Sequence, residues 1–216
     1  MDILNFTFCA LDLGISNNDI ISMKKEILNV DAKYWYTDNF RGCEILPLIN
    51  GGGTTGAPLT GVHRDKGDMV LTDAIKTCPT TNNIIETKIF PFMNMRTRVS
   101  VLKTKKEHGL NVHVDCGKHK LQTIQHKFRI VLSGEIDKLF FLNNKNEKVY
   151  VPPYFKTYVL DGTHPHAIDP GNEEKLTICF GTPWTGELTE TYSKLLENSP
   201  FKLKSSKPEI LDKWIK

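Results

Sequence analysis

The chain has 216 residues, with 28 lysines and arginines against 25 acidic residues and a formal charge of +3. A hydrophobic content of 39% beside 25% charged residues excludes intrinsic disorder, collagen and coiled coil, and indicates a folded globular protein. The small positive surplus is too weak to indicate a nucleic-acid partner. Because no stretch approaches the roughly 18 apolar residues of a membrane span, we also expect no membrane partner.

Cysteine usage points to a reducing compartment. The cysteines are odd in number, widely scattered and never arranged as Cys-x-x-Cys, which disfavours both a disulfide framework and a structural zinc site. The N-terminal residues also lack the cationic head of a secretory signal. We therefore expect free thiols and a cytoplasmic location.

Residues 17 to 29 predict an amphipathic helix near the N-terminus. Ser16 precedes the stretch as a candidate N-cap, with Asp19 three residues later. Ile20, Met23, Ile27 and Leu28 recur at helical spacing, so we expect them near one face of the helix.

A glycine-rich stretch, NGGGTTGAPLTG, follows at residues 50 to 61. It lacks the Gly-Lys-Ser/Thr ending and the strand-to-helix setting of a phosphate-binding loop. We interpret it as a mobile segment, with a lid over a site as the alternative.

From about residue 95 the chain changes to short runs rich in β-branched and aromatic residues. Arg96, Arg98 and Ser100 alternate with Thr97 and Val99, which is the period of two expected of a strand. The runs are RTRVSVLKT, HKFRIVLSG, KLFFLNN, KVYVPP, KTYVLDG and KLTICFGTPW. Such a succession, broken by turn residues, predicts a sandwich or barrel.

The C-terminal part predicts a second helix at residues 185 to 198, capped by Thr185 and ending before Pro200. We interpret the lysine-rich run from 202 to 216 as a solvated tail. The expected organisation is one domain over 1–216, mainly β with flanking helices. Its parts are a helical and loop region at 1–87, a β core at 88–184 and a C-terminal helix and tail at 185–216.

A possible metal site stands out among the seven histidines. His113 and Asp115 share one side of an extended segment, and a further histidine follows about 50 residues later in HPHAID. Two imidazoles and one carboxylate on one face leave coordination positions open, as in non-haem Fe(II) oxygenases. The pair His63 and Asp65 has the same spacing, but it follows the glycine-rich stretch and is interpreted as a surface loop.

Here the chain resembles the aspartyl/asparaginyl β-hydroxylase-like branch of the Fe(II)- and 2-oxoglutarate-dependent oxygenases, within the cupin superfamily. The likeness covers about 90 residues in an ordered set of segments, with a weaker extension into DNFRGCEILPLI. The segments are MRTRVSVLKTKKEHGLNVHVDCG, HKFRIVLSG and KTYVLDGTHPHAIDPGNEEKLTICFGTPW. The resemblance implies a double-stranded β-helix, or jelly-roll, barrel over residues 88–184.

The resemblance also implies an iron site made of His113, Asp115 and His166. His166 is preferred because HAID matches the family's distal segment better than HPHA does. Asp169 stands where asparagine is usual. His164 remains open as an alternative ligand or as a donor just outside the ligand set.

The resemblance also implies two positively charged side chains that would bind the co-substrate. Lys175 stands where the family has an arginine for the far carboxylate of 2-oxoglutarate, and a lysine offers a point charge instead of a bidentate fork. Arg129 matches a second family arginine near the co-substrate. Solvent-facing positions remain the alternative for both, and Arg96 and Arg98 are candidates either for substrate carboxylates or for the sheet surface.

The function implied is an Fe(II)- and 2-oxoglutarate-dependent dioxygenase. It would consume O2, release succinate and CO2, and hydroxylate an amino-acid or peptidyl substrate that resembles Asp or Asn. Two alternatives remain open: a non-catalytic barrel that binds a small ligand or a partner, and a zinc or manganese cupin. His119 and His126, which flank the stretch after the His113–Asp115 pair, are expected to be exposed polar residues.

Overall fold

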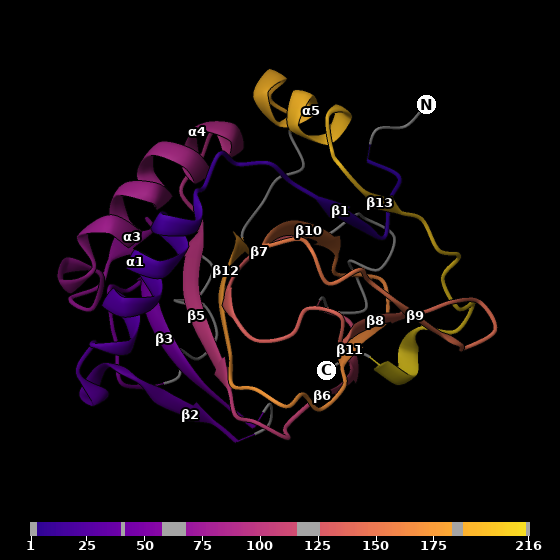
Figure 1. Cartoon of the computed structure of the whole chain (residues 1–216), viewed down its shortest axis with the longest axis horizontal. Coiled ribbons are helices and arrows are strands. Elements are labelled where there is room, and N and C mark those ends of the chain that lie inside the picture. The colour runs from indigo at the N-terminus through magenta and orange to yellow at the C-terminus, as the bar shows by residue number, and fades with distance from the viewer. Residues whose placement is uncertain (1–3, 40–41, 58–67, 116–125, 183–187, 215–216) are drawn as a thin grey trace.

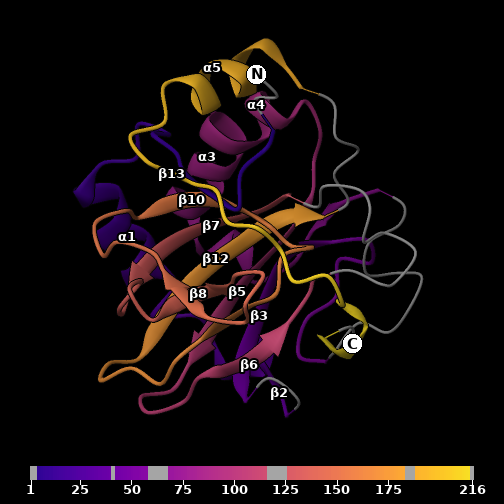
Figure 2. The ribbon, with the colours of Figure 1, turned by 90° about the vertical axis from the view of Figure 1, so that its right-hand side faces the viewer.

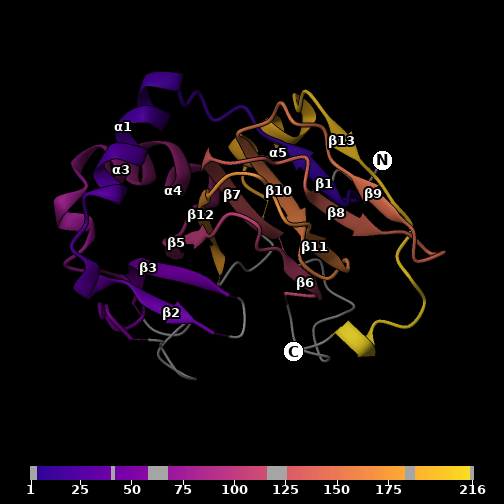
Figure 3. The same ribbon diagram turned by 60° about the horizontal axis from the view of Figure 1, so that its bottom comes forward.

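The computed structural model describes residues 4–39, 42–57, 68–115, 126–182 and 188–214. Two antiparallel β-sheets face one another, and helices cover the outer side of the larger sheet (Figures 1 and 3). This arrangement confirms the predicted mainly β class with flanking helices and its double-stranded β-helix architecture.

The larger sheet has the strand order β13-β1-β10-β7-β12-β5-β3-β2, with β4 paired to β3. Its strands from the first 87 residues therefore pair directly with strands of the predicted core. The bounds are β1 Phe8–Ala10, β2 Tyr36–Asp38, β3 Cys43–Asn50, β4 Val70–Leu71, β5 Arg98–Thr104, β7 His126–Ser133, β10 Thr157–Asp161, β12 Lys175–Thr182 and β13 Lys202–Leu203.

The smaller sheet has the order β6-β11-β8-β9. Its strands are β6 Leu110–His113, β8 Leu139–Leu142, β9 Lys148–Tyr150 and β11 His166–Ile168. All six β runs read from the sequence are strands in the structure.

Alternation along the strands gives the larger sheet two different faces. In β7, Phe128 and Ile130 join the core cluster that contains Met23 and Ile27 of the helices. Val131 instead packs with Phe141 of the smaller sheet. Since successive side chains point to opposite faces, the residues of β7 in phase with Val131 face the space between the sheets.

The predicted N-terminal helix is confirmed as α1, Asn17–Leu28, with a complete capping box between Ser16 and Asp19. Ile20, Met23 and Ile27 are buried, but Leu28, expected on the same face, is 49% exposed at the end of the helix. The predicted C-terminal helix starts later than expected: α5 spans Glu190–Glu197 and Thr189 caps it. The expected cap, Thr185, lies outside the described residues.

A helical stretch between residues 79 and 93 was not anticipated from the sequence. It consists of α3 Pro79–Ile84, the π-helix η3 Ile85–Ile89 and α4 Phe90–Met93. Threonine, asparagine and isoleucine are weak helix formers, so burial of Ile84, Ile85 and Ile89 stabilises this stretch. Short 3-10 turns are η1 Ala32–Tyr34, η2 Ile75–Thr77 and η5 Asp212–Trp214. Among the described helices, none has the length and apolar character to cross a membrane.

Glu26 ties α1 to the start of α3. Its carboxylate accepts hydrogen bonds from the Thr80 amide at 2.8 Å, and from the Thr81 amide and hydroxyl at 2.9 and 2.8 Å. Burial acts to raise the pKa of Glu26, but these hydrogen bonds outweigh it and leave the pKa below its ordinary value.

Replacing Glu26 with alanine is therefore expected to lower the free energy of unfolding by about 2 kcal/mol at neutral pH, because hydrogen bonds to a charged group are lost. Since the folded-state pKa is depressed, the effect should shrink as pH falls below about 4.5. Urea unfolding at pH 7 and pH 4 measures the difference. An equal loss at both pH values would contradict this account.

The lysine-rich C-terminal run is not the solvated tail expected from its composition. β13 pairs with β1, and the Lys207 ammonium lies 2.5 Å from the carboxylate of Asp161, which is buried. Trp214 packs against the smaller sheet. Charge density in the sequence was a poor guide, because lysine heads reach solvent or acidic partners while their neighbours pair and pack.

Candidate metal centre

The three residues singled out in the sequence come together at one end of the smaller sheet. β6 and β11 are antiparallel neighbours, and His113 pairs directly with His166 in their register (Figure 3). Asp115 follows His113 by two residues. One potential ligand atom from each residue can be chosen so that all three lie within 4.8 Å of one another.

The distances within this group are short and even. Nε2 of His113 lies 3.6 Å from one carboxylate oxygen of Asp115, and Nε2 of His166 lies 3.7 Å from the other. The two imidazole centroids are 4.5 Å apart. The side chains are mostly shielded, with exposures of 12% for His113, 15% for Asp115 and 5% for His166.

Backbone carbonyl groups fix the orientation of both imidazoles. Nδ1 of His113 lies 2.7 Å from the carbonyl oxygen of Asn111, and Nδ1 of His166 lies 2.8 Å from that of His164. A carbonyl only accepts, so each Nδ1 carries the proton and donates it. In the neutral form of each ring, Nε2 then carries the lone pair that could bind a metal ion. A hydrogen bond from the other ring nitrogen to a carbonyl is typical of histidine metal ligands.

The charges also suit a cation. Burial acts to raise the pKa of Asp115, but the His113 and His166 rings and the Arg129 guanidinium outweigh it and hold the pKa well below its ordinary value. Burial and the neighbouring His113 lower the pKa of His166 to about 4. At neutral pH the centre therefore presents a carboxylate and a neutral imidazole, and this donor set fits a divalent metal ion.

Arg129 lies on the face of β7 that points into the space between the two sheets, in phase with Val131. Its guanidinium contacts the Asp115 carboxylate at 3.4 Å and donates to the Phe128 carbonyl at 2.8 Å. In the register of the larger sheet, Arg129 lies between Tyr158 of β10 and Cys179 of β12. Only 16% of the Arg129 side chain is exposed. The alternative that this arginine lies on the solvent-facing surface of the sheet is therefore wrong.

Lys175 is buried at the start of β12, with 7% exposure. Its ammonium and the hydroxyl of Thr177 are buried polar groups with no hydrogen-bond partner among the described residues. The two residues are separated by one position and so lie on the same face of the strand. Burial lowers the pKa of Lys175 to about 8.

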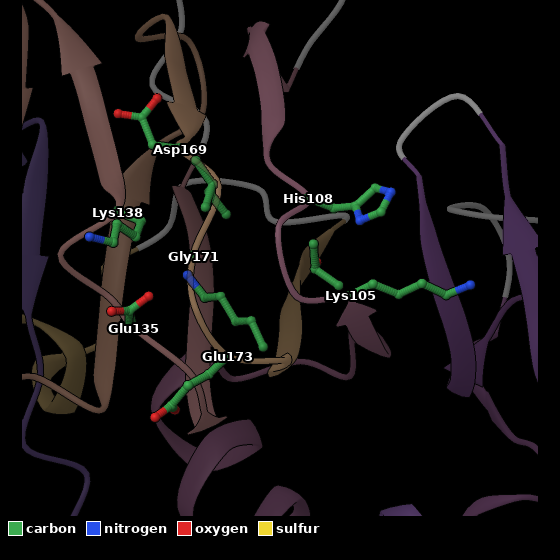
Figure 4. A pocket seen from close by; sticks show the side chains of 10 residues that line it. Lys105, His108, Glu135, Lys138, Asp169, Gly171 and Glu173 are labelled. Atoms are coloured by element: carbon green, nitrogen blue, oxygen red, sulfur yellow. The ribbon is translucent and has the colours of Figure 1, made fainter.

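Gly134 brings the end of β7 directly against this lysine. Its φ of +88° belongs to the region that favours glycine, and a Cβ there would lie 2.7 Å from the Cα of Lys175. The close approach fixes the backbone from which Lys175 projects. A shallow surface recess adjoins the same end of β12, lined by charged side chains including Lys105, Glu135 and Glu173 (Figure 4).

Thr177 was not identified from the sequence, although the alternation Lys175-x-Thr177-x-Cys179 within a strand pattern was a usable signal. The two supporting carbonyls, of Asn111 and His164, carry no sequence signal because any residue supplies a carbonyl group.

The remaining candidates lie elsewhere. The His164 ring contacts the Leu142 carbonyl and the Thr7 hydroxyl, away from the group of three. His126 is buried against the Tyr192 hydroxyl at 2.8 Å, so the expectation of an exposed residue was wrong. Arg96 pairs with Glu86 and is half exposed. His63, Asp65 and His119 lie outside the described residues.

Comparisons with known proteins give the fold and no sequence relative. No protein-family model matches the chain, and none of the curated proteins matches it. Among solved structures, HygX from Streptomyces hygroscopicus with nickel, 2-oxoglutarate and hygromycin B bound has a TM-score of 0.54 at 10% identity, covering 97% of this chain and 96% of that one.

Two further solved structures are similar. A Pseudomonas putida prolyl-4-hydroxylase has a TM-score of 0.52 at 13% identity, covering 84% of this chain and 95% of that one. OsALKBH1 has a TM-score of 0.51 at 11% identity, covering 82% and 98%. At these identities the similarity establishes a shared fold, and the chemistry has to be argued from the side chains.

Proposed function

We propose that this protein is an Fe(II)- and 2-oxoglutarate-dependent dioxygenase. The observation that carries the proposal is the convergence of His113, Asp115 and His166, with both Nε2 atoms free to ligate, in the same barrel as a buried cation that has no described partner. Burying an ammonium without a partner costs free energy, and an anionic co-substrate bound beside it would offset that cost. The sequence resemblance and the shared fold support the same assignment.

In this proposal His113, Asp115 and His166 hold the metal. The carbonyls of Asn111 and His164 retain the Nδ1 protons, so neither imidazole can rotate without losing a hydrogen bond. Arg129 keeps Asp115 ionised and limits its movement. Three protein ligands on one side leave room for a bidentate co-substrate and for O2.

Lys175 and Thr177 are assigned to the far carboxylate of 2-oxoglutarate. A carboxylate would satisfy both the ammonium and the hydroxyl, neither of which has a hydrogen-bond partner among the described residues. Leu176 and Ile178 join the core on the helix side, so Lys175 and Thr177 lie on the opposite face of the strand, toward the smaller sheet. The family that the sequence resembles has an arginine at the position of Lys175, which also supports a positive charge that pairs with this carboxylate. A lysine cannot form the bidentate pair that an arginine forms.

When bound, Fe(II) with 2-oxoglutarate and O2 supplies the oxidising power: one oxygen atom enters a substrate C–H bond, the other enters succinate, and CO2 is released. The protein's own residues orient these groups and shield them from water. The low exposure of His166, Arg129 and Lys175 serves that second task.

For the substrate we propose an amino acid or peptide that carries a carboxylate or amide, as in the family that the sequence resembles. Among the proteins that share the fold, the prolyl-4-hydroxylase is named for an amino-acid residue, and HygX was solved with hygromycin B. A small-molecule substrate is the alternative within the same chemistry.

Anaerobic titration of the purified protein with Fe(II) and 2-oxoglutarate tests the proposal. A metal-to-ligand charge-transfer absorption should appear only when both are present. Admission of O2 should then yield succinate, and mass spectrometry of amino-acid and peptide mixtures should reveal gain of one oxygen atom. Tight binding of zinc or manganese without the absorption and without succinate would instead favour the metal-binding cupin.

A further inference from the structure

The C-terminal segment, defined here as residues 201–214, runs across the outside of the barrel to the metal centre. It pairs with β1 through β13 and ends in the short helix η5 beside the smaller sheet (Figures 1 and 2). Two of its residues, Lys207 and Trp214, contact the chain next to the metal-ligand residues.

Trp214 holds the backbone between two of these ligands. The amide of Val114, which lies between His113 and Asp115, donates a hydrogen bond of 3.0 Å to the Trp214 carbonyl. Val114 is 1% exposed, so its amide is a buried donor that water cannot serve. If the Trp214 carbonyl moved away, the buried Val114 amide between His113 and Asp115 would lose its acceptor, which costs free energy.

The Trp214 ring covers the outer face of the same two strands. It packs against the cluster formed by Ala167 of β11 with Phe140 and Leu142 of β8, and Val112 of β6 packs against the same cluster. Val112 and Ala167 are the sequence neighbours of His113 and His166. Because alternate residues of a strand point to opposite faces, burying these two neighbours outside turns both imidazoles inward.

Lys207 contacts the segment 161–163, which hydrogen-bonds to the backbone of Asp115. Its ammonium pairs with Asp161 at 2.5 Å and also contacts the Thr163 hydroxyl. Gly162, between them, accepts a hydrogen bond of 2.7 Å from the Asp115 amide. The C-terminal segment therefore holds the Val114 amide through the Trp214 carbonyl, and through Lys207 it holds the residues on either side of Gly162, which accepts from the Asp115 amide.

We propose that the C-terminal segment positions the metal ligands, with Trp214 as its principal positioning residue. This inference rests on the proposed function, since it concerns affinity for the same metal. In this proposal the C-terminal segment, although distant in sequence, keeps His113, Asp115 and His166 close together before the metal binds.

The test compares Trp214→Ala, Trp214→Phe and the control Leu196→Ala. Leu196 is fully buried in the main core, in a different hydrophobic cluster from Trp214 and distant in sequence from the ligand residues. Its truncation should therefore destabilise the fold without altering the metal centre. Mn(II) affinity is measured by calorimetry at a temperature where all variants are folded. Trp214→Ala should weaken it about 10–100-fold, the range typical for loss of an outer support, whereas Trp214→Phe and Leu196→Ala should stay close to wild type.

Amide hydrogen exchange gives a readout that needs no metal. Alanine keeps the backbone carbonyl that accepts from Val114 but removes the ring that packs the segment against the smaller sheet, so the peptide containing Val114 should lose protection in Trp214→Ala and keep it in Leu196→Ala. Unchanged Mn(II) affinity and unchanged exchange in Trp214→Ala would overturn the positioning role. If the wild-type protein bound no metal, the proposed function would fail, and exchange at Val114 would still decide whether Trp214 holds the turn.

Discussion

Replacing Lys175 with methionine is expected to make the co-substrate-free protein more stable. The ammonium is buried without a described hydrogen-bond partner, and burial lowers its pKa from 10.5 to about 8. A depression of that size corresponds to about 3 kcal/mol of unfavourable free energy at neutral pH. Methionine has a similar length and no charge, so most of this cost should disappear.

The pH dependence gives this prediction a definite sign. Between pH 8 and 10.5 the unfolded chain binds more protons at this lysine than the folded protein does, so the stability of the wild type should rise with pH over that range. The advantage of Lys175→Met should therefore be full below pH 8 and fade above it. Chemical unfolding at pH 7 and pH 9.5 measures both effects, and a less stable methionine variant would contradict the unpaired state of the lysine.

The same substitution should remove most of the affinity for 2-oxoglutarate. Loss of one member of a buried charge pair typically costs about 2–5 kcal/mol, which is at least about thirtyfold in Kd. Wild-type affinity should be constant below pH 8 and weaken above it as the free ammonium loses its proton, whereas Lys175→Arg should keep its affinity to higher pH.

Lys105→Met is the matched control, because Lys105 is an exposed lysine that lines the recess beside the same end of β12. It should change neither stability nor affinity. Calorimetric titration of 2-oxoglutarate into the Mn(II)-loaded protein provides the Kd values. Equal affinity in Lys175→Met and wild type would remove Lys175 from the co-substrate site and leave the metal centre untouched.

Loss of a metal ligand is the second large effect. His113→Ala and His166→Ala are each expected to reduce Fe(II) affinity by more than the roughly 10–100-fold that loss of an outer support costs, and to abolish succinate formation. The physical reason is that each removes one of three donors and leaves Asp115 with only one imidazole beside it.

His108→Ala is the control for these variants, because His108 is an exposed histidine five positions before His113. It should retain full affinity and turnover. Calorimetry under anaerobic conditions and a succinate assay give the two readouts. Retention of turnover in His166→Ala would show that another group, with His164 the nearest in sequence, completes the centre.

Local sequence pattern determined much of the fold. The β-branched and aromatic residues of HKFRIVLS and KLTICF predicted two central strands, and the Ser16-Asp19 pair marked the start of α1. These features depend on neighbouring residues, whose relation is set by strand and helix periods. The helical stretch at 79–93 escaped because its residues have weak propensity and are held by tertiary burial.

The sequence by itself also determined which residue types were available for a metal centre: His113 and Asp115 on one side of a strand end, and a pair of histidines farther on. Only the tertiary structure decided that His166 joins them while His164 turns toward Leu142 and Thr7. It alone showed that Lys175 is buried without a hydrogen-bond partner in the described part of the chain, and that the Trp214 carbonyl accepts from the Val114 amide between His113 and Asp115. The register between strands and the pairing of distant segments decide these matters, because burial and hydrogen bonding depend on partners that are remote along the chain.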